Sequence, residues 1–151
     1  MGRTGVAIVF LLGACAGSAA TVVTEGARAN AKPGEAAVVP IEAAPVRVSP
    51  NGQARVTILA QGFNAFLAKL EMDPGAKVPP NRDATEEYVH VLEGSGKVTI
   101  DGKSYDVAPG TTIYMPANSD CSFDNGDQKL VGIQIWAGPE PSKKYDAWTP
   151  K

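Results

Sequence analysis

The sequence predicts an all-β fold, a single antiparallel β-barrel or sandwich, and three observations lead to this prediction. Turn-forming residue pairs recur about every ten residues from residue 44 onward. The segments between these turns alternate apolar and polar residues, as half-buried strands do. Glycine and proline supply 16 and 12 of the 151 residues and are spread along the chain, which is typical of a protein with many turns.

The composition is that of one globular domain. Hydrophobic residues make up 44% of the chain and charged residues 20%, so there is enough apolar material for a core. With 14 basic and 16 acidic side chains, the net charge is −2, and we expect no nucleic-acid partner. Two cysteines are too few for a disulfide scaffold.

Residues 1–14 predict a secretory signal peptide. Arg3 precedes an apolar run over residues 5–14, which is too short to span a bilayer as a permanent helix. Residues 12–15, Leu-Gly-Ala-Cys, resemble the bacterial lipobox, in which a peptidase cuts before a lipidated cysteine. We therefore expect lipidation of Cys15 and a membrane-anchored lipoprotein that faces the periplasm or the cell exterior.

Residues 16–38 predict a flexible tether between Cys15 and a folded domain at 39–151. The tether is rich in alanine and glycine and shows no sustained helical or strand period. Cleavage after Ala20 is the alternative to lipidation, and it would release a soluble protein without Cys15. Both alternatives export the chain.

Within the domain, the alternating segments predict short strands at 54–60, 97–100, 103–107, 111–115, 121–124 and 129–136. Asp101-Gly102 and Asn125-Gly126 supply the positive φ that tight hairpin turns need, so we expect a hairpin at each pair. In the last strand, the apolar residues at 131, 133 and 135 share one side, and Gln134 lies on the other.

The periodicity of residues 62–73 is ambiguous. A helical spacing joins Phe63, Phe66, Leu67 and Leu70, whereas Phe66, Ala68, Leu70 and Met72 alternate as in a strand. Periodicity alone slightly favours a helix. Only the family resemblance described below makes us expect a strand here.

Two segments, residues 74–102 and 105–126, carry the motifs of a known family. In the first segment, Glu87 is followed after six residues by Gly94. In the second, Pro109-Gly110 precedes residues 115–117, Met-Pro-Ala. These segments resemble the two motifs of the cupin superfamily, G-x5-H-x-H-x3,4-E-x6-G and G-x5-P-x-G-x2-H-x3-N. The resemblance covers residues 72–136 and implies a small β-barrel of the jelly-roll type with a pocket inside.

Cupins usually bind a divalent metal through two histidines and a glutamate of the first motif and a histidine of the second. The resemblance places Asn81, Asp83 and Cys121 at the three histidine positions, and only Glu87 retains the family's residue type. If Glu87 points into the barrel, strand alternation directs the only histidine, His90, outward. The usual imidazole-rich site is therefore absent from this sequence.

The altered set Asn81, Asp83, Glu87 and Cys121 mixes ligand types. Oxygen ligands suit Mg, Ca or Mn, whereas a thiolate suits Zn or Cu(I). We expect no stoichiometric Fe, Ni or Cu, and at most a weakly bound divalent metal such as Zn. An alternative is that Asp83 is a solvated loop residue and Cys121 a small buried apolar residue.

Catalysis by these residues would use their carboxylates. Paired carboxylates, Glu87 and Asp83, could act as acid and base if burial raises the pKa of Glu87. The acidic neighbours of Cys121 raise the pKa of its thiol, which argues against a cysteine nucleophile.

Aromatic residues give a further expectation. Tyr105, Tyr114, Phe123 and Trp136 lie on predicted strands, where they are core and sheet-surface residues or, alternatively, stack on a ligand. Residues 138–151 carry two more aromatic residues, Tyr145 and Trp148, and we expect this tail to fold back over the barrel or over a partner subunit. The cupin resemblance implies a homodimer.

Three hypotheses for the function follow. The favoured one is an exported, lipid-anchored cupin-domain protein that binds a small molecule or an ion in the barrel pocket. The second is a cupin-type isomerase, lyase or epimerase that uses Glu87 and Asp83. The third is a structural envelope protein whose barrel serves for dimerisation. An empty, water-filled acidic cavity would support either of the first two, and a barrel filled by side chains would support the third.

Overall fold

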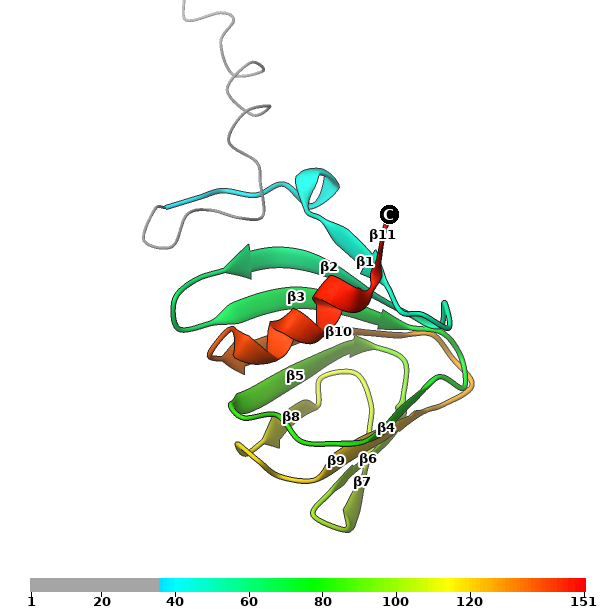
Figure 1. Cartoon of the computed structure of the whole chain (residues 1–151). Helices are drawn as coiled ribbons and strands as arrows, with labels where there is room; N and C mark the ends of the chain where they lie inside the picture. Colours follow the sequence, from blue (N-terminus) through cyan, green and yellow to red (C-terminus); the bar gives the residue numbers. More distant parts are fainter. Residues whose placement is uncertain (1–35) are drawn as a thin grey trace, which may run out of the picture.

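The computed structural model describes residues 36–151, which form two antiparallel sheets and two short 3-10 helices (Figure 1). The all-β prediction is therefore confirmed. In chain order the elements are η1 (Ile41–Ala43), β1 (Val46–Val48), β2 (Ala54–Gln61), β3 (Phe66–Met72), β4 (Lys77–Asn81), β5 (Glu86–Glu93), β6 (Gly96–Ile100), β7 (Lys103–Val107), β8 (Thr112–Met115), β9 (Cys121–Asn125), β10 (Leu130–Ala137), η2 (Glu140–Ala147) and β11 (Thr149–Pro150).

The two sheets form a jelly-roll barrel. The seven-stranded sheet has the order β11-β1-β2-β3-β10-β5-β8, and the four-stranded sheet has the order β4-β9-β6-β7. Buried residues of both sheets meet between them, among them Val89 and Val91 from β5 and Val98 from β6. This contact between the inner faces makes the first of two hydrophobic cores, which we call the barrel core.

The ambiguous segment forms strand β3, as expected. Phe66, Ala68 and Met72 are buried on its inner face, whereas Phe63, which only the helical spacing includes, is 69% exposed. Strands β2 and β10 pair with β3 on its two sides, so hydrogen bonding along β3 is satisfied by its neighbours. Tertiary pairing thus decides a segment that periodicity leaves open.

The predicted hairpin at Asp101-Gly102 is confirmed. These two residues have φ of 47° and 78°, and they join β6 to β7 with Ile100 opposite Lys103. Positive φ at both central positions is the geometry of a type I′ turn, whose twist matches that of paired strands.

The expected hairpin at Asn125-Gly126 is wrong. Strands β9 and β10, on either side of this pair, lie in different sheets, and Gly126 does not have a positive φ. Asn125 is buried, and its amide donates hydrogen bonds to the carbonyl oxygens of Asp73 (2.7 Å) and Gln128 (3.0 Å). A side chain at 126 would meet the Ser95 carbonyl oxygen at 2.8 Å, so glycine serves close backbone approach at a crossover.

Strand β10 alternates as predicted, and its isoleucines face outward. Ile135 is 37% exposed, whereas Gln134 and Trp136 are buried on the inner face. The inner face of β10 therefore carries an amide and an indole. This orientation directs Gln134 toward the interior of the barrel.

The C-terminal tail folds back over the seven-stranded sheet. Figure 1 shows η2, in red, lying over the sheet near β3 and β10. A second hydrophobic core, which we call the aromatic core, forms beneath η2 from Val56, Phe66, Ala68, Trp136 and Tyr145. Strand β11 then pairs with β1.

Among residues 36–151 there is no helix with the length and apolar character needed to cross a membrane. Cys15, the signal peptide and most of the tether lie outside the described residues.

Candidate ligand-binding cavity

A cavity of about 420 Å³ lies inside the barrel. Its walls are mainly apolar and come from both sheets; they include Met72, Val89, Val91, Val98, Ile113 and Phe123. Exposed residues at 50–53 and on β4 also line it, which places its mouth at this end of the barrel. This hollow does not match a barrel filled by side chains, and its mainly apolar walls also differ from the acidic cavity named for the first two hypotheses.

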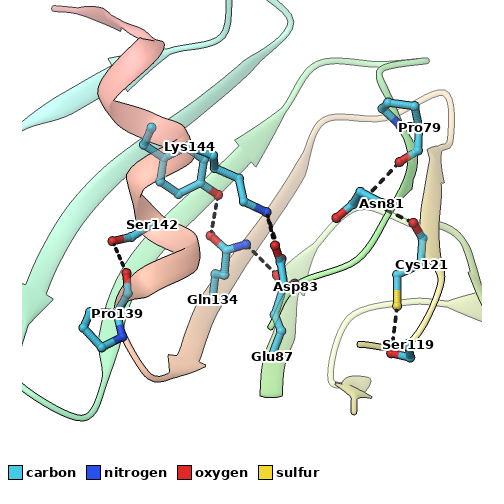
Figure 2. A network of polar contacts seen from close by, with 11 residues as sticks. Pro79, Asn81, Asp83, Glu87, Ser119, Cys121, Gln134, Pro139, Ser142 and Lys144 are labelled. Atoms are coloured by element: carbon cyan, nitrogen blue, oxygen red, sulfur yellow. Dashed lines mark hydrogen bonds and ion pairs between the residues drawn. The ribbon is translucent and has the colours of Figure 1, made fainter. Parts of the chain in front are cut away.

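One end of the cavity is polar, and Glu87 is its central residue. Because Val89 and Val91 point inward, the alternation of β5 turns Glu87 inward as well. Its Oε1 accepts a hydrogen bond of 2.6 Å from Nε2 of Gln134 on β10 (Figure 2). The hydroxyl of Tyr145 on η2 donates to Oε1 of Gln134 at 2.8 Å. Three elements thus converge on one carboxyl group.

Burial raises the pKa of Glu87 above its ordinary value of 4.5. The hydrogen bond from Gln134 and the charge of Lys144 oppose this effect, and the charge of Asp83 adds to it. The indole N–H of Trp136 also lies near enough to favour the charged form, although it has no partner of ordinary hydrogen-bond geometry among the described residues. The net direction is upward, so the site favours the protonated carboxyl group.

Asp83 forms an ion pair with a residue of the C-terminal tail. Nζ of Lys144 on η2 lies 2.8 Å from each carboxylate oxygen of Asp83, and Figure 2 shows the lysine reaching across to it. The same ammonium lies 4.8 Å from the centre of the Trp136 ring, within range of a cation–π interaction. The side chain of Asp83 is 14% exposed. Asp83 is therefore a partly buried, paired carboxylate rather than a solvated loop residue.

Asn81 and Cys121 are opposite each other on β4 and β9. Nδ2 of Asn81 donates to the carbonyl oxygens of Pro79 (3.0 Å) and Cys121 (3.1 Å). Sγ of Cys121 lies 3.3 Å from Oγ of Ser119, whose proton goes to the carbonyl oxygen of Pro116. Burial, followed by the charges of Glu87 and nearby aspartates, raises the pKa of the Cys121 thiol, the direction that the sequence predicted.

All four predicted site residues, Asn81, Asp83, Glu87 and Cys121, line one small hollow of about 10 Å³, next to the main cavity. Within residues 36–151, however, there is no group of three histidine, cysteine or acidic side chains arranged to hold a metal ion. Asp83 is paired with an ammonium, the Asn81 amide N–H groups bond to backbone, and the Cys121 thiol is held in its protonated form. This donor set does not fit the divalent metal that the resemblance implies.

The other candidate residues lie away from the polar end. His90 is exposed on the outer face of β5, with Nδ1 2.9 Å from Oγ1 of Thr112. Phe123 lines the cavity, whereas Tyr105 and Tyr114 are exposed and Trp136 belongs to the aromatic core.

Sequence reasoning missed three polar participants: Gln134, Lys144 and Tyr145. Gln134 gave one signal, because it is the only polar side chain in the apolar run from 130 to 137. Lys144 and Tyr145 gave no comparable signal. Their roles depend on where the tail packs after the barrel has formed.

Comparison with known proteins agrees with the fold. Residues 68–135 match the family model Cupin_2, described as a cupin domain. This match covers less than half of the chain, and solved cupin structures share the fold of the domain.

Curated relatives match over part of their length. The chain is 34% identical over 84 residues to the dimethylsulfoniopropionate lyase DddW of Ruegeria pomeroyi, covering 52% of this chain and 55% of that protein. It is 32% identical over 66 residues to an uncharacterised protein of Methanocaldococcus jannaschii, covering 43% and 53%. The chain thus spans about half the length of these two relatives.

Solved structures share the fold at low identity. A polyketide cyclase, RemF, from Streptomyces resistomycificus has a TM-score of 0.59 and 20% identity, over 68% of this chain and 79% of that one. A predicted oxalate decarboxylase from Thermotoga maritima has a TM-score of 0.58 and 19% identity, over 67% and 98%. An RmlC-like cupin from Shewanella frigidimarina has a TM-score of 0.57 and 17% identity, over 61% and 82%.

Proposed function

We propose that this domain binds a small, uncharged and mainly apolar molecule inside the barrel, without using a bound metal. The observation that carries the proposal is the cavity of about 420 Å³, which has mainly apolar walls and, inside the barrel, a polar end at Glu87 and Gln134. A cavity of this kind favours a ligand with an apolar body and one hydrogen-bonding head group.

The polar end defines the head group. In the protonated form of Glu87, the proton resides on Oε2, because Oε1 already accepts a hydrogen bond from Gln134. A protonated Oε2 donates a hydrogen bond to a carbonyl, ether or hydroxyl oxygen of a ligand. Asp83 and Lys144 form an ion pair that carries no net charge, which fits an uncharged head group.

A neutral fluorescent probe, N-phenyl-1-naphthylamine, tests the binding proposal. Its emission should rise saturably on addition to the full chain. Val98→Phe, which adds a ring to a buried wall residue, should weaken binding by about tenfold or more because it fills the cavity. Native mass spectrometry of the purified protein would then identify a co-purified ligand by its mass.

The matched control is Thr99→Phe, the same ring on the next residue of β6, which hydrogen-bonds Ser104 and does not line the cavity. It should bind the probe as the wild type does. Equal affinity of the wild type and Val98→Phe, both folded by circular dichroism, would refute binding inside the barrel.

A second candidate function is proton transfer by Glu87, as in a lyase, isomerase or epimerase. Two observations favour it: the raised pKa of a buried carboxyl group at a cavity end, and the similarity to a protein named a lyase. Incubation with dimethylsulfoniopropionate, followed by proton NMR, tests it directly. Turnover by the wild type that Glu87→Gln abolishes, with probe binding retained, would place this function first. An unchanged substrate would reject this particular lyase activity.

We also propose that the chain is exported and anchored to a membrane through lipidated Cys15. The support is the sequence of residues 1–15 alone. Cys15→Ser should move the protein from the membrane fraction to the soluble fraction. Cys121→Ser, which changes the other cysteine, is the control and should leave it in the membrane fraction. Equal membrane association of wild type and Cys15→Ser would contradict the anchor.

A further inference from the structure

Lys144 occupies an unusual place for a lysine in the C-terminal tail. Its ammonium contacts both oxygens of Asp83, faces the ring of Trp136 at 4.8 Å and lowers the pKa of Glu87 through its charge. It also lines the main cavity. One cation from η2 therefore pairs with Asp83 and also acts on Glu87 through its charge.

We propose that Lys144 is a tethered cation that takes the place of a divalent metal at this end of the barrel and keeps metal ions out. In the resembling family the site is built around a bound cation. Here a cation is supplied covalently, by a helix that packs on the seven-stranded sheet through Tyr145. The affinity of the site for a metal ion then depends on residue 144 as well as on the absence of the family's three histidines.

Two physical effects exclude a metal ion. A divalent cation near Asp83 would have to displace the ammonium from a bidentate contact, and the two positive charges would repel each other. The ammonium also holds one carboxylate that a metal needs as a ligand. Each effect disappears when the charge at residue 144 is removed.

The donors that would then become available are mainly oxygens. They are the carboxylates of Asp83 and Glu87 and Oδ1 of Asn81, whose Nδ2 is engaged with the backbone. All three residues line the same small hollow. Oxygen donors suit hard divalent ions such as Mn²⁺, Mg²⁺ or Ca²⁺. The proposal therefore predicts that a Lys144 variant gains a site for Mn²⁺.

The experiment is a titration of the full chain with Mn²⁺. Binding is measured as the loss of the electron paramagnetic resonance signal of the free ion. Lys144→Met should bind one ion at least about tenfold more tightly than the wild type. Lys144→Arg keeps a cation that can pair with Asp83, so it should behave as the wild type does. Adding Asp83→Asn to Lys144→Met should abolish the gain.

The matched control is Lys143→Met, which makes the same charge change at the adjacent exposed lysine. It should not gain a site, since Lys143 does not line the cavity. Melting curves verify folding, and Lys144→Gln is a second variant if methionine is not tolerated. Tight one-to-one Mn²⁺ binding by the wild type, or equal affinities of the Lys144 and Lys143 variants, would overturn the proposal. The readout is metal binding, so it is independent of the cavity ligand.

Discussion

The inner face of the seven-stranded sheet is covered in two different ways. Beneath η2, the aromatic core brings Phe66 to 5.2 Å and Tyr145 to 5.5 Å from Trp136, measured between ring centres. Opposite the four-stranded sheet, the barrel core surrounds a cavity of about 420 Å³. One sheet therefore supports a filled core and a hollow one side by side.

The size of the side chains explains this difference. Facing sheets lie about 10 Å apart, and the branched side chains of Val89, Val91 and Val98 are too short to fill the space between them. Large rings fill the space beneath η2 because each brings a large buried area. We infer that the aromatic core supplies stability and that the barrel core gives up part of its packing to hold a ligand.

The largest expected effect is that of Trp136→Ala. Trp136 is fully buried and contacts two aromatic residues, so its removal should lower the free energy of unfolding by about 3–5 kcal/mol. Urea denaturation at constant pH measures the loss. The matched change in the barrel core is Val91→Ala. It should lower the free energy of unfolding clearly less, because Val91 borders a cavity and the substitution removes fewer atoms. A larger loss at Val91 would reverse the comparison.

Tyr145→Phe tests the link between the two cores. The Tyr145 ring belongs to the aromatic core, while its hydroxyl donates to Gln134 at the polar end of the cavity. Loss of the hydroxyl leaves a buried amide oxygen without this donor and should cost about 1–3 kcal/mol in unfolding experiments. It should also weaken probe binding, because Gln134 orients Glu87. A loss of stability with unchanged probe binding would show that the aromatic core and the cavity are not linked through Tyr145.

Gly102→Val tests the sheet that covers the hollow. At φ of 78° a β-branched residue is strained, and open space around Gly102 means that the cost comes from backbone strain alone. We expect a loss of about 1–2 kcal/mol, measured as a lower urea midpoint. Gly102→Asn, a residue that tolerates positive φ, is the control and should cost less. An unchanged midpoint for the valine variant would contradict the turn.

The smallest effect concerns pH. The folded-state pKa of Glu87 is raised from 4.5, so its contribution to stability is complete below pH 4.5 and is lost as the pH rises through the folded pKa. Glu87→Gln lacks this loss. The stability of Glu87→Gln relative to the wild type should therefore increase from pH 4 towards neutral pH. Urea unfolding of both proteins across this range measures the difference, and a constant difference would exclude a shifted pKa.

Local patterns were sufficient for much of the fold and for part of the site. The family resemblance implies that Glu87 points inward, strand alternation then turns His90 outward, and the structure has both. Asp101-Gly102 predicts its own hairpin because the turn type depends on the φ angles of two adjacent residues. Asn125-Gly126 led to a wrong prediction because a residue pair specifies only a local turn. Whether the strands on either side of it pair with each other depends on the rest of the chain, and here they lie in different sheets.

The sequence by itself determined most of the longer strands and the absence of the family's three histidines, because these depend on residue identity and on a period of two, and its resemblance to cupins implied the inward carboxyl group of Glu87. Only the tertiary structure decided that Lys144 pairs with Asp83 across 61 residues, that Tyr145 reaches Gln134, and that the barrel is hollow. The physical reason is that pairing and packing depend on distances between segments remote in the chain. Residue spacing carries no record of those distances.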